Sequence, residues 1–272
     1  MKTQRKKWTA AAMAAAMAAA MAVMSLTACG TKATPENLFR DMNKRASEVD
    51  SLRMNMKLDM NIEAAGESVS MGMDFAMEAT SDPEMSSAKG VGSVGWGGID
   101  TSTEIETYSE KQGDEYIVYT KSENGWTVQK EDSAGMSTDI GVVSEDIEKF
   151  ASQFELDKDL VQVNGEDCFQ LTGTITGEFL SEFMGEDMLS SFAGLGLDED
   201  GLADISMPCT IDVYKESILP ARMTFDMGEA LLPILEAAGL DAAECTVEMT
   251  FLDYDAVGEI VIPEEALEAA GS

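Results

Sequence analysis

The clearest pattern in the chain is a strict alternation of apolar and polar residues over residues 52–62. Every second residue in this stretch is apolar, and the residues between are Arg, Asn, Lys, Asp and Asn. Such alternation is typical of a β-strand with one buried and one solvated face. The alternation resumes over 69–77 after a turn at 65–67, so the two stretches predict a long antiparallel hairpin.

Similar stretches recur along most of the chain. Asn124-Gly125 and Asn164-Gly165 are typical two-residue hairpin turns between them. The stretch 88–96 is rich in glycine, which predicts a bend or a close approach to another backbone. Strands joined in sequence by short turns predict one curved antiparallel sheet. The further strands are expected at 88–96, 101–110, 115–122, 126–128, 159–164, 166–176, 209–214, 221–227, 245–251 and 260–262.

A few amphipathic helices are expected to cover the apolar face of this sheet. The sequence Thr34-Pro35-Glu36 predicts the start of a helix, with Thr as the N-cap, Pro at the first helical position and an acidic residue in the first turn. Shorter helices are expected after Ser144 and in the acidic tail. The apolar helices at 178–192 and 230–238 fit either a lid over a cavity or ordinary packing on the sheet. Residues assigned to the lid are Phe179, Phe183 and Met184.

The N-terminus has the three parts of a secretory signal. A basic start is followed by an uncharged stretch over 8–28, which ends in Leu26-Thr27-Ala28-Cys29. These four residues resemble the lipobox of bacterial lipoproteins. The resemblance implies cleavage of a signal peptide, 1–28, and attachment of lipid to Cys29, followed by a tether, 29–34. The alternatives are a membrane-spanning signal anchor, or an ordinary signal in which the cysteine is a coincidence.

The composition of the chain excludes several kinds of partner and site. The net charge is −33, and removal of a signal with four basic residues and no acids makes it −37. That charge repels nucleic acid and anionic lipid headgroups, so no nucleic-acid partner is expected. The absence of histidine excludes His-dependent triads and His metal sites. We expect no cofactor and no metal. Cys168, Cys209 and Cys245 have no CxxC spacing and are either buried thiols or one disulfide with one thiol left over.

Methionine is unusually frequent on the predicted dry faces, where Val, Ile and Leu would specify a core better. Met is flexible and fills irregular space, so a face lined with Met and Phe can accept an acyl chain or another variable apolar ligand. The alternative is an ordinary, adaptable core. Residues assigned to the ligand-binding lining are Met54, Met56, Met71, Met73, Phe75, Met223, Phe225 and Met249.

The order of elements also resembles a known superfamily. A lipobox, an N-terminal helix, a long alternating hairpin, Asn-Gly-Trp and a late Ile-Pro accompany a short motif that runs from Asp212-Val213-Tyr214 to Leu219-Pro220. This arrangement resembles the LolA/LolB and LppX/LprG-like lipoproteins, especially small ones of Gram-positive type. The resemblance implies a mainly β fold with a few helices, in which a strongly curved antiparallel sheet forms an incomplete β-barrel and helices plug its open side. It also implies binding of lipid or acyl chains in the hollow.

The leading hypothesis is therefore a single domain over 35–272, anchored by lipid to the extracytoplasmic face of a membrane, that binds lipid or another hydrophobic ligand and is not an enzyme. A second hypothesis is a surface sensor or protein-interaction module with a filled core. A third, weaker one is a hydrolase with paired carboxylates, but no GxSxG or P-loop motif supports an active site.

Overall fold

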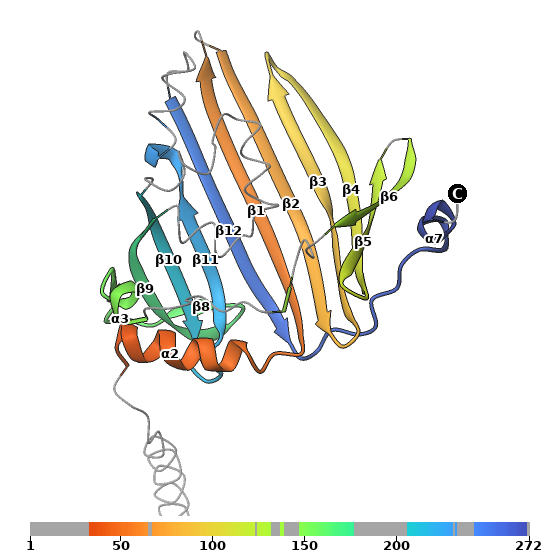
Figure 1. Ribbon diagram of the computed structural model, residues 1–272. Coiled ribbons are helices and arrows are strands. Elements are labelled where there is room, and N and C mark those ends of the chain that lie inside the picture. The colour runs from red at the N-terminus through yellow and green to blue at the C-terminus, as the bar shows by residue number, and fades with distance from the viewer. Residues whose placement is uncertain are drawn as a thin grey trace, which may run out of the picture.

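The fold is a single broad antiparallel sheet with short helices at its margins (Figure 1). A computed structural model describes residues 33–64, 67–122, 124–131, 137–138, 147–176, 206–230, 232 and 242–270. Within these residues the fold is mainly β with a few helices, and the sheet is not closed into a barrel, as the sequence predicts.

The sheet contains twelve strands in the order β6-β5-β4-β3-β2-β1-β12-β11-β10-β9-β7, and β8 also pairs with β9. Among the described strands, β6 and β7 form its two edges. The strands are β1 (Ser51–Ala64), β2 (Glu67–Ser81), β3 (Glu84–Trp96), β4 (Ile99–Gln112), β5 (Glu115–Ser122), β6 (Gly125–Glu131), β7 (Phe154–Leu156), β8 (Val161–Val163), β9 (Glu166–Thr176), β10 (Ser206–Tyr214), β11 (Pro220–Asp226) and β12 (Ala242–Tyr254).

The predicted alternating hairpin is confirmed and forms the centre of the sheet. Met54 pairs with Met77, and Met60 pairs with Met71, so the apolar residues of β1 and β2 share one face. We call the face that bears Met54 the inner face and the opposite one the outer face. Beyond the register shift between Arg53 and Met54, alternate residues stay on the same side, so the inner face is continuous across the neighbouring strands.

Helix α2 (Pro35–Ala46) begins as the sequence predicts. The Thr34 side chain accepts a hydrogen bond from the Asn37 N–H at 3.3 Å, and proline occupies the first turn. The helix lies across one end of the sheet, close to α3 (Ile147–Ala151) (Figure 1). Phe39 of α2 is fully buried against Phe150 and Phe154, with ring centroids 4.9 and 5.1 Å away. This aromatic cluster joins both helices to the edge of the inner face.

The expectation of a strand at 260–262 is wrong. This segment is irregular and leads into α7 (Glu264–Ala270), which packs against β5 and β6. Ile260 and Ile262 are buried in a second core with Tyr108 and Tyr119, whereas Val261 is 67% exposed. The alternation that imitates a strand arises because an extended segment lies over the outer face without pairing, so that every second side chain meets it.

Candidate functional site

The predicted lining residues lie together on the inner face. Phe75 pairs with Met56, Met56 with Met249, and Met249 with Met223, which places these four side chains in one row across β2, β1, β12 and β11. The rest of the predicted set occupies adjacent rungs of the same strands. The sheet thus brings together residues that are up to about 200 positions apart in the chain, as alternation on each strand predicts.

The row continues beyond Phe75 across glycine. Gly90 pairs with Phe75 and then with Ile105. A Cβ placed on Gly90 would lie 2.7 Å from the Phe75 ring and 2.0 Å from the carbonyl oxygen of Asp74. The close approach that the glycine-rich stretch predicts is therefore present, and the absence of a side chain at Gly90 lets the Phe75 ring lie against the backbone of β3.

The predicted lining residues are most deeply buried on β11 and β12, and the more exposed ones lie on β1 and β2. Met223 and Phe225 are 1% exposed and Met249 is 3% exposed, so they belong to a packed core. Met54 and Phe75 are also buried, and Met56 and Met71 are half-buried against this core. Met73 is 37% exposed. The predicted lining residues therefore comprise a packed group and a solvent-facing group.

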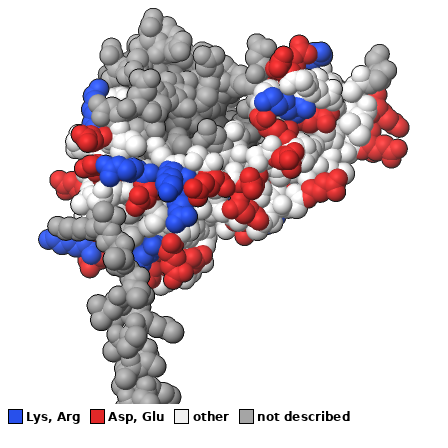
Figure 2. All heavy atoms as spheres, turned by 60° about the horizontal axis from the view of Figure 1, so that its bottom comes forward, with Lys and Arg blue, Asp and Glu red and all other residues white. Residues whose placement is uncertain are grey.

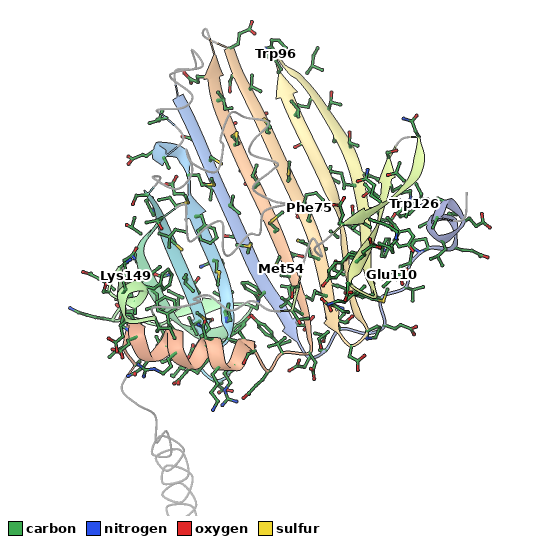
Figure 3. The ribbon with its side chains drawn as sticks, viewed as in Figure 1. Met54, Phe75, Trp96, Glu110, Trp126 and Lys149 are labelled. Atoms are coloured by element: carbon green, nitrogen blue, oxygen red, sulfur yellow. The ribbon has the colours of Figure 1, made fainter. Side chains whose placement is uncertain are left out.

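Sequence reasoning missed the residues that extend the solvent-facing group. Val94 pairs with Met71, Trp96 with Val69, and Ile99 with Trp96, so all three lie on the inner face. Val94, Trp96 and Ile99 are 49%, 63% and 72% exposed. Trp96 stands at the end of the sheet remote from α2, while Phe75 lies in its middle (Figure 3). The alternation within 88–96 already placed Val94 and Trp96 on one side, but it could not reveal that this side stays uncovered.

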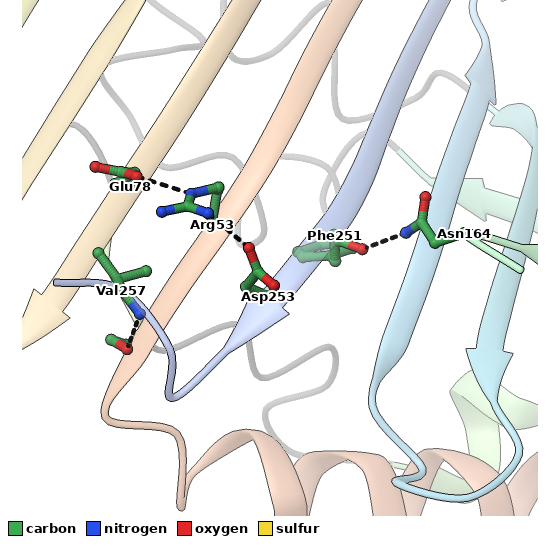
Figure 4. Close-up of polar contacts among 7 residues, drawn as sticks. Arg53, Glu78, Asn164, Phe251, Asp253 and Val257 are labelled. Atoms are coloured by element: carbon green, nitrogen blue, oxygen red, sulfur yellow. Dashed lines mark hydrogen bonds and ion pairs between the residues drawn. The ribbon is translucent and has the colours of Figure 1, made fainter. Parts of the chain in front are cut away.

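The outer face is polar near its centre and carries a separate feature. Arg53 donates to Glu78 at 2.8 Å and to Asp253 at 2.7 Å (Figure 4). Beside this cluster lies a half-open groove of about 440 Å³, lined by Arg53, Ala76, Glu78, Ser87, Lys89, Tyr108, Glu259, Ile260 and Val261. Because Arg53 already contacts two carboxylates and Lys89 lies 3.4 Å from Glu106, neither cation is left to attract an anionic ligand.

The buried carboxylate of the described residues, Asp212, has structural partners. Asp212 is fully buried and accepts hydrogen bonds from Arg222 at 2.9 Å and Gln170 at 2.8 Å. No cluster of three or more potential metal ligands occurs in the described part of the chain. The hydrolase hypothesis requires two carboxylates that converge in a cleft. The buried carboxylate of Asp212 contacts an arginine and a glutamine instead, so it does not form such a pair.

The three cysteines of the described ranges are buried free thiols, which decides between the two alternatives left open by the sequence. Burial raises the pKa of Cys168 and of Cys245 to about 11. Burial also raises the pKa of Cys209 far above its ordinary value. The thiolate is the reactive form, so these groups are inert at neutral pH.

Charge is distributed unevenly over the surface. Figure 2, which brings the α2 end forward, shows Asp and Glu side chains spread widely and Lys and Arg gathered in fewer places. The chain has 51 acidic and 18 basic residues, so this imbalance is a property of the whole molecule.

Some predicted features lie outside the described residues. These are the signal segment, the lipidation residue Cys29 and the lid residues Phe179, Phe183 and Met184. Of the helix expected at 230–238, only Ala230 and Leu232 are described, and both are helical. None of the helices in the described ranges is long and apolar enough to cross a bilayer.

Comparison with known proteins gives a family and several similar folds. A family model described as "Family of unknown function (DUF6612)" matches residues 34–271. No curated protein matches the chain significantly.

Among solved structures, LprF from Mycobacterium bovis is similar at 14% identity and a TM-score of 0.46, over 85% of this chain and 97% of that one. A DUF1329 family protein from Desulfovibrio piger matches at 10% identity and a TM-score of 0.26, over 84% and 96% of the two chains. A putative outer membrane lipoprotein-sorting protein domain from Vibrio parahaemolyticus matches at 11% identity and a TM-score of 0.25, over 83% and 95%.

Proposed function

Since the chain belongs to this DUF6612 family, whose function is unknown, we propose a function from its own residues: an extracytoplasmic lipoprotein, anchored through Cys29, that binds an acyl chain or another hydrophobic ligand on its inner face. The observation that carries the proposal is the row Phe75–Met56–Met249–Met223. This row is apolar throughout; Met223, Met249 and Phe75 are buried, Met56 is half-buried, and exposed Met73 lies beside Phe75 on the same face of β2.

The side chains of this row suit a ligand of variable shape. Met has three rotatable bonds and a polarisable sulfur, so it adapts to different apolar partners at low cost. Half-buried Met56 and exposed Met73 stand at the boundary between core and solvent. An acyl chain laid over them would gain about 0.8 kcal/mol for each CH2 removed from water. No chemical step is needed, and binding is reversible.

Ligand binding is tested with the full chain purified natively from an envelope fraction. The purified protein is extracted with organic solvent, and the extract is analysed by mass spectrometry for stoichiometric lipid. The same preparation is titrated with a fluorescent fatty acid. We expect co-purified lipid or saturable uptake, and uptake that falls strongly in Met73→Glu because a carboxylate would then face the apolar chain.

Val91→Glu is the matched control, since Val91 is 41% exposed on the outer face of β3 and its change leaves the inner face intact. A clean extract together with no fatty-acid uptake would contradict the proposal. Anchoring is tested separately by the mass of the N-terminal peptide, which should carry diacylglycerol on Cys29 and lose it in Cys29→Ser.

The second candidate is an interaction module with a filled core. The burial of Met223, Phe225 and Met249 to 3% exposure or less favours it. The two candidates differ in one respect that the titration measures: a filled core excludes the fluorescent fatty acid, while exposed Met73 remains available to a macromolecular partner.

A further inference from the structure

The segment between β12 and α7, dark blue in Figure 1, crosses the outer face without joining the sheet. It is fixed at two points: the Val257 N–H donates to Ser51 Oγ at 3.2 Å, and the Pro263 carbonyl accepts from two amides of α7. Between these points, the backbone groups of 258–262 form no hydrogen bond with any other residue that the structure describes. A row of unpaired backbone groups on an extended segment is a template for pairing with another chain.

The side chains of this segment alternate in the way that strand pairing requires. Ile260 and Ile262 are 6% and 8% exposed and belong to the second core, while Val261 is 67% exposed. Because the peptide groups of an extended chain lie at right angles to its side chains, those of 258–262 point sideways, along the surface of the sheet. Gly258 leaves room beside them, since a Cβ there would meet no atom within 4 Å. A chain laid beside the segment can therefore pair with it and rest on the sheet.

The groove of about 440 Å³ on the outer face provides the space for such a chain, and we name it the outer groove. One wall is formed by Glu259–Val261, and the floor is the outer face of β1–β4. Ala76 and Ser87 keep this floor low, because their side chains are small and those of the neighbouring Lys89 and Tyr108 are large. Paired chains lie about 4.8 Å apart, so a strand paired with this wall would run through the outer groove.

Two polar side chains of the outer groove are available to a ligand. Ser87 is only 7% exposed, and its hydroxyl forms no hydrogen bond within the described ranges, which is uncommon for a buried polar group. Glu259 is exposed and has no ion pair with another described residue. Arg53 and Lys89, by contrast, already contact carboxylates (Figure 4 shows Arg53). The outer groove thus offers a hydroxyl and an uncompensated carboxylate, and both of its cations are neutralised.

From this combination we propose that the outer groove binds an extended peptide, which adds as a strand to segment 258–262 and directs a Lys or Arg side chain to Glu259. A peptide backbone is the complementary ligand, because its N–H and C=O groups alternate at the same spacing as those of the segment. The hydroxyl of Ser87 on the floor can bond a polar group that the peptide turns toward the sheet. Anionic ligands are disfavoured, since both cations are already paired with carboxylates.

This inference goes beyond the proposed function and does not depend on it. The acyl ligand is assigned to the inner face of the sheet, whereas the peptide is assigned to the outer face. A chain that takes up no fatty acid is still expected to bind the peptide, and a chain that binds no peptide can still take up fatty acid. The two proposals therefore fail separately.

The test uses the full chain, purified natively from an envelope fraction, and a labelled peptide with blocked ends, Thr-Val-Thr-Lys-Thr-Val-Thr. Its alternating β-branched residues favour an extended conformation, and its central Lys is the partner for Glu259. Fluorescence anisotropy gives the affinity, and we expect saturable binding. A peptide with Glu in the central position should bind at least about tenfold more weakly, because it would face a carboxylate.

Two N-methylated versions of the peptide test whether the backbone is recognised. One is methylated at its even-numbered amides and the other at its odd-numbered amides. Because a strand turns alternate amides to opposite edges, only one version should lose affinity, by about tenfold or more. Hydrogen exchange gives an independent readout: the amides of 258–262 should exchange rapidly in the free protein, and the bound peptide should slow alternate ones.

Matched variants of the protein locate the site. Ala76→Leu raises the floor of the outer groove, whereas Ser70→Leu makes a similar change on the same face of β2, outside the groove. Ala76→Leu should weaken peptide binding about tenfold or more and leave fatty-acid uptake unchanged, and Ser70→Leu should alter neither. Glu259→Gln should abolish the preference for Lys over Glu in the peptide, and Glu244→Gln should keep it. Circular dichroism and thermal unfolding establish that each variant is folded.

Three results would overturn the proposal. The first is the absence of saturable binding by the Lys peptide. The second is an equal affinity of the two N-methylated peptides, which would mean that the backbone does not pair with the segment. The third is an equal effect of Ala76→Leu and Ser70→Leu, which would place any bound peptide outside the outer groove.

Discussion

The two halves of the inner face are built from the same kinds of residue and yet meet different surroundings. On β10–β12, Met223, Phe225 and Met249 are almost completely buried. On β2–β4, Met73 and Val94 occupy equivalent alternate positions and are 37% and 49% exposed. Residue type does not explain this contrast. What differs is whether another element covers the strand.

The covered half is packed from several sides. Phe39 of α2, Phe150 of α3 and Phe154 of β7 form one aromatic cluster at its edge. On its outer face, Asn164 of the β8–β9 turn donates to the Phe251 carbonyl at 2.9 Å, and Tyr214 donates to the same oxygen. In the open half, α7 and residues 260–262 cover the outer face instead of the inner one. On the inner face of the open half, Met73, Val94, Trp96 and Ile99 are exposed.

The largest expected effect comes from truncating methionine in both halves. Met223→Ala should lower the free energy of unfolding by about 2–5 kcal/mol, because it leaves a cavity in a close-packed core. Met73→Ala should lower the free energy of unfolding by less than about 1 kcal/mol, because the side chain is already partly solvated. Urea unfolding of the two variants gives both values. Equal losses would mean that the two halves are packed alike in solution.

Removing the buried carboxylate of the covered half should have the next largest effect. Asp212→Ala leaves Arg222 and Gln170 without their acceptor, and the expected loss is about 3 kcal/mol. Asp253→Ala is the control, because Arg53 keeps Glu78 and the site is partly exposed, so its loss should stay below about 1 kcal/mol. If the two variants unfold at similar urea concentrations, the buried ion pair of Asp212 does not stabilise the fold more than the exposed pair of Asp253.

Two glycines of β3 test how tightly the open half is packed. Gly90→Ala should destabilise by about 1–3 kcal/mol, since its Cβ would lie 2.0 Å from the Asp74 carbonyl oxygen. Gly92→Ala lies two residues away on the same face, where the new Cβ would meet only Ile105 Cδ1, at 3.4 Å. We expect the free energy of unfolding of that variant to lie within about 0.5 kcal/mol of the wild-type value. A similar loss in both would show that strand propensity, and not the contact with Asp74, governs this strand.

Local patterns predicted most of the strands, and the reason is physical. Where one face of a strand is buried and the other wet, alternation records both faces, as in residues 52–62. The same rule fails at 260–262. There the apolar side chains alternate between buried and exposed because the segment lies over the outer face of the sheet without pairing with a strand. It also cannot distinguish Met223 from Met73, because the burial of a strand face depends on elements that are distant in the sequence. The candidate site was thus predictable as a face, but its division into core and exposed surface was not.

The smallest effect expected is electrostatic and lies on the inner face of the open half, where Glu84 begins β3. Hydrogen bonds from Lys111 and then from Tyr116 lower the pKa of the Glu84 carboxyl below its ordinary value of 4.5. A lowered folded-state pKa stabilises the fold fully above the unfolded value, and that contribution is lost as the pH falls through the folded value. Glu84→Gln should therefore be slightly less stable than wild type at pH 7, with a difference that shrinks as the pH is lowered below 4.5. Thermal unfolding across this range measures the difference, and Glu115→Gln, which removes only an exposed pair with Lys130, should show a smaller one. A difference that grows in acid would contradict the hydrogen-bonded, ionised state of Glu84.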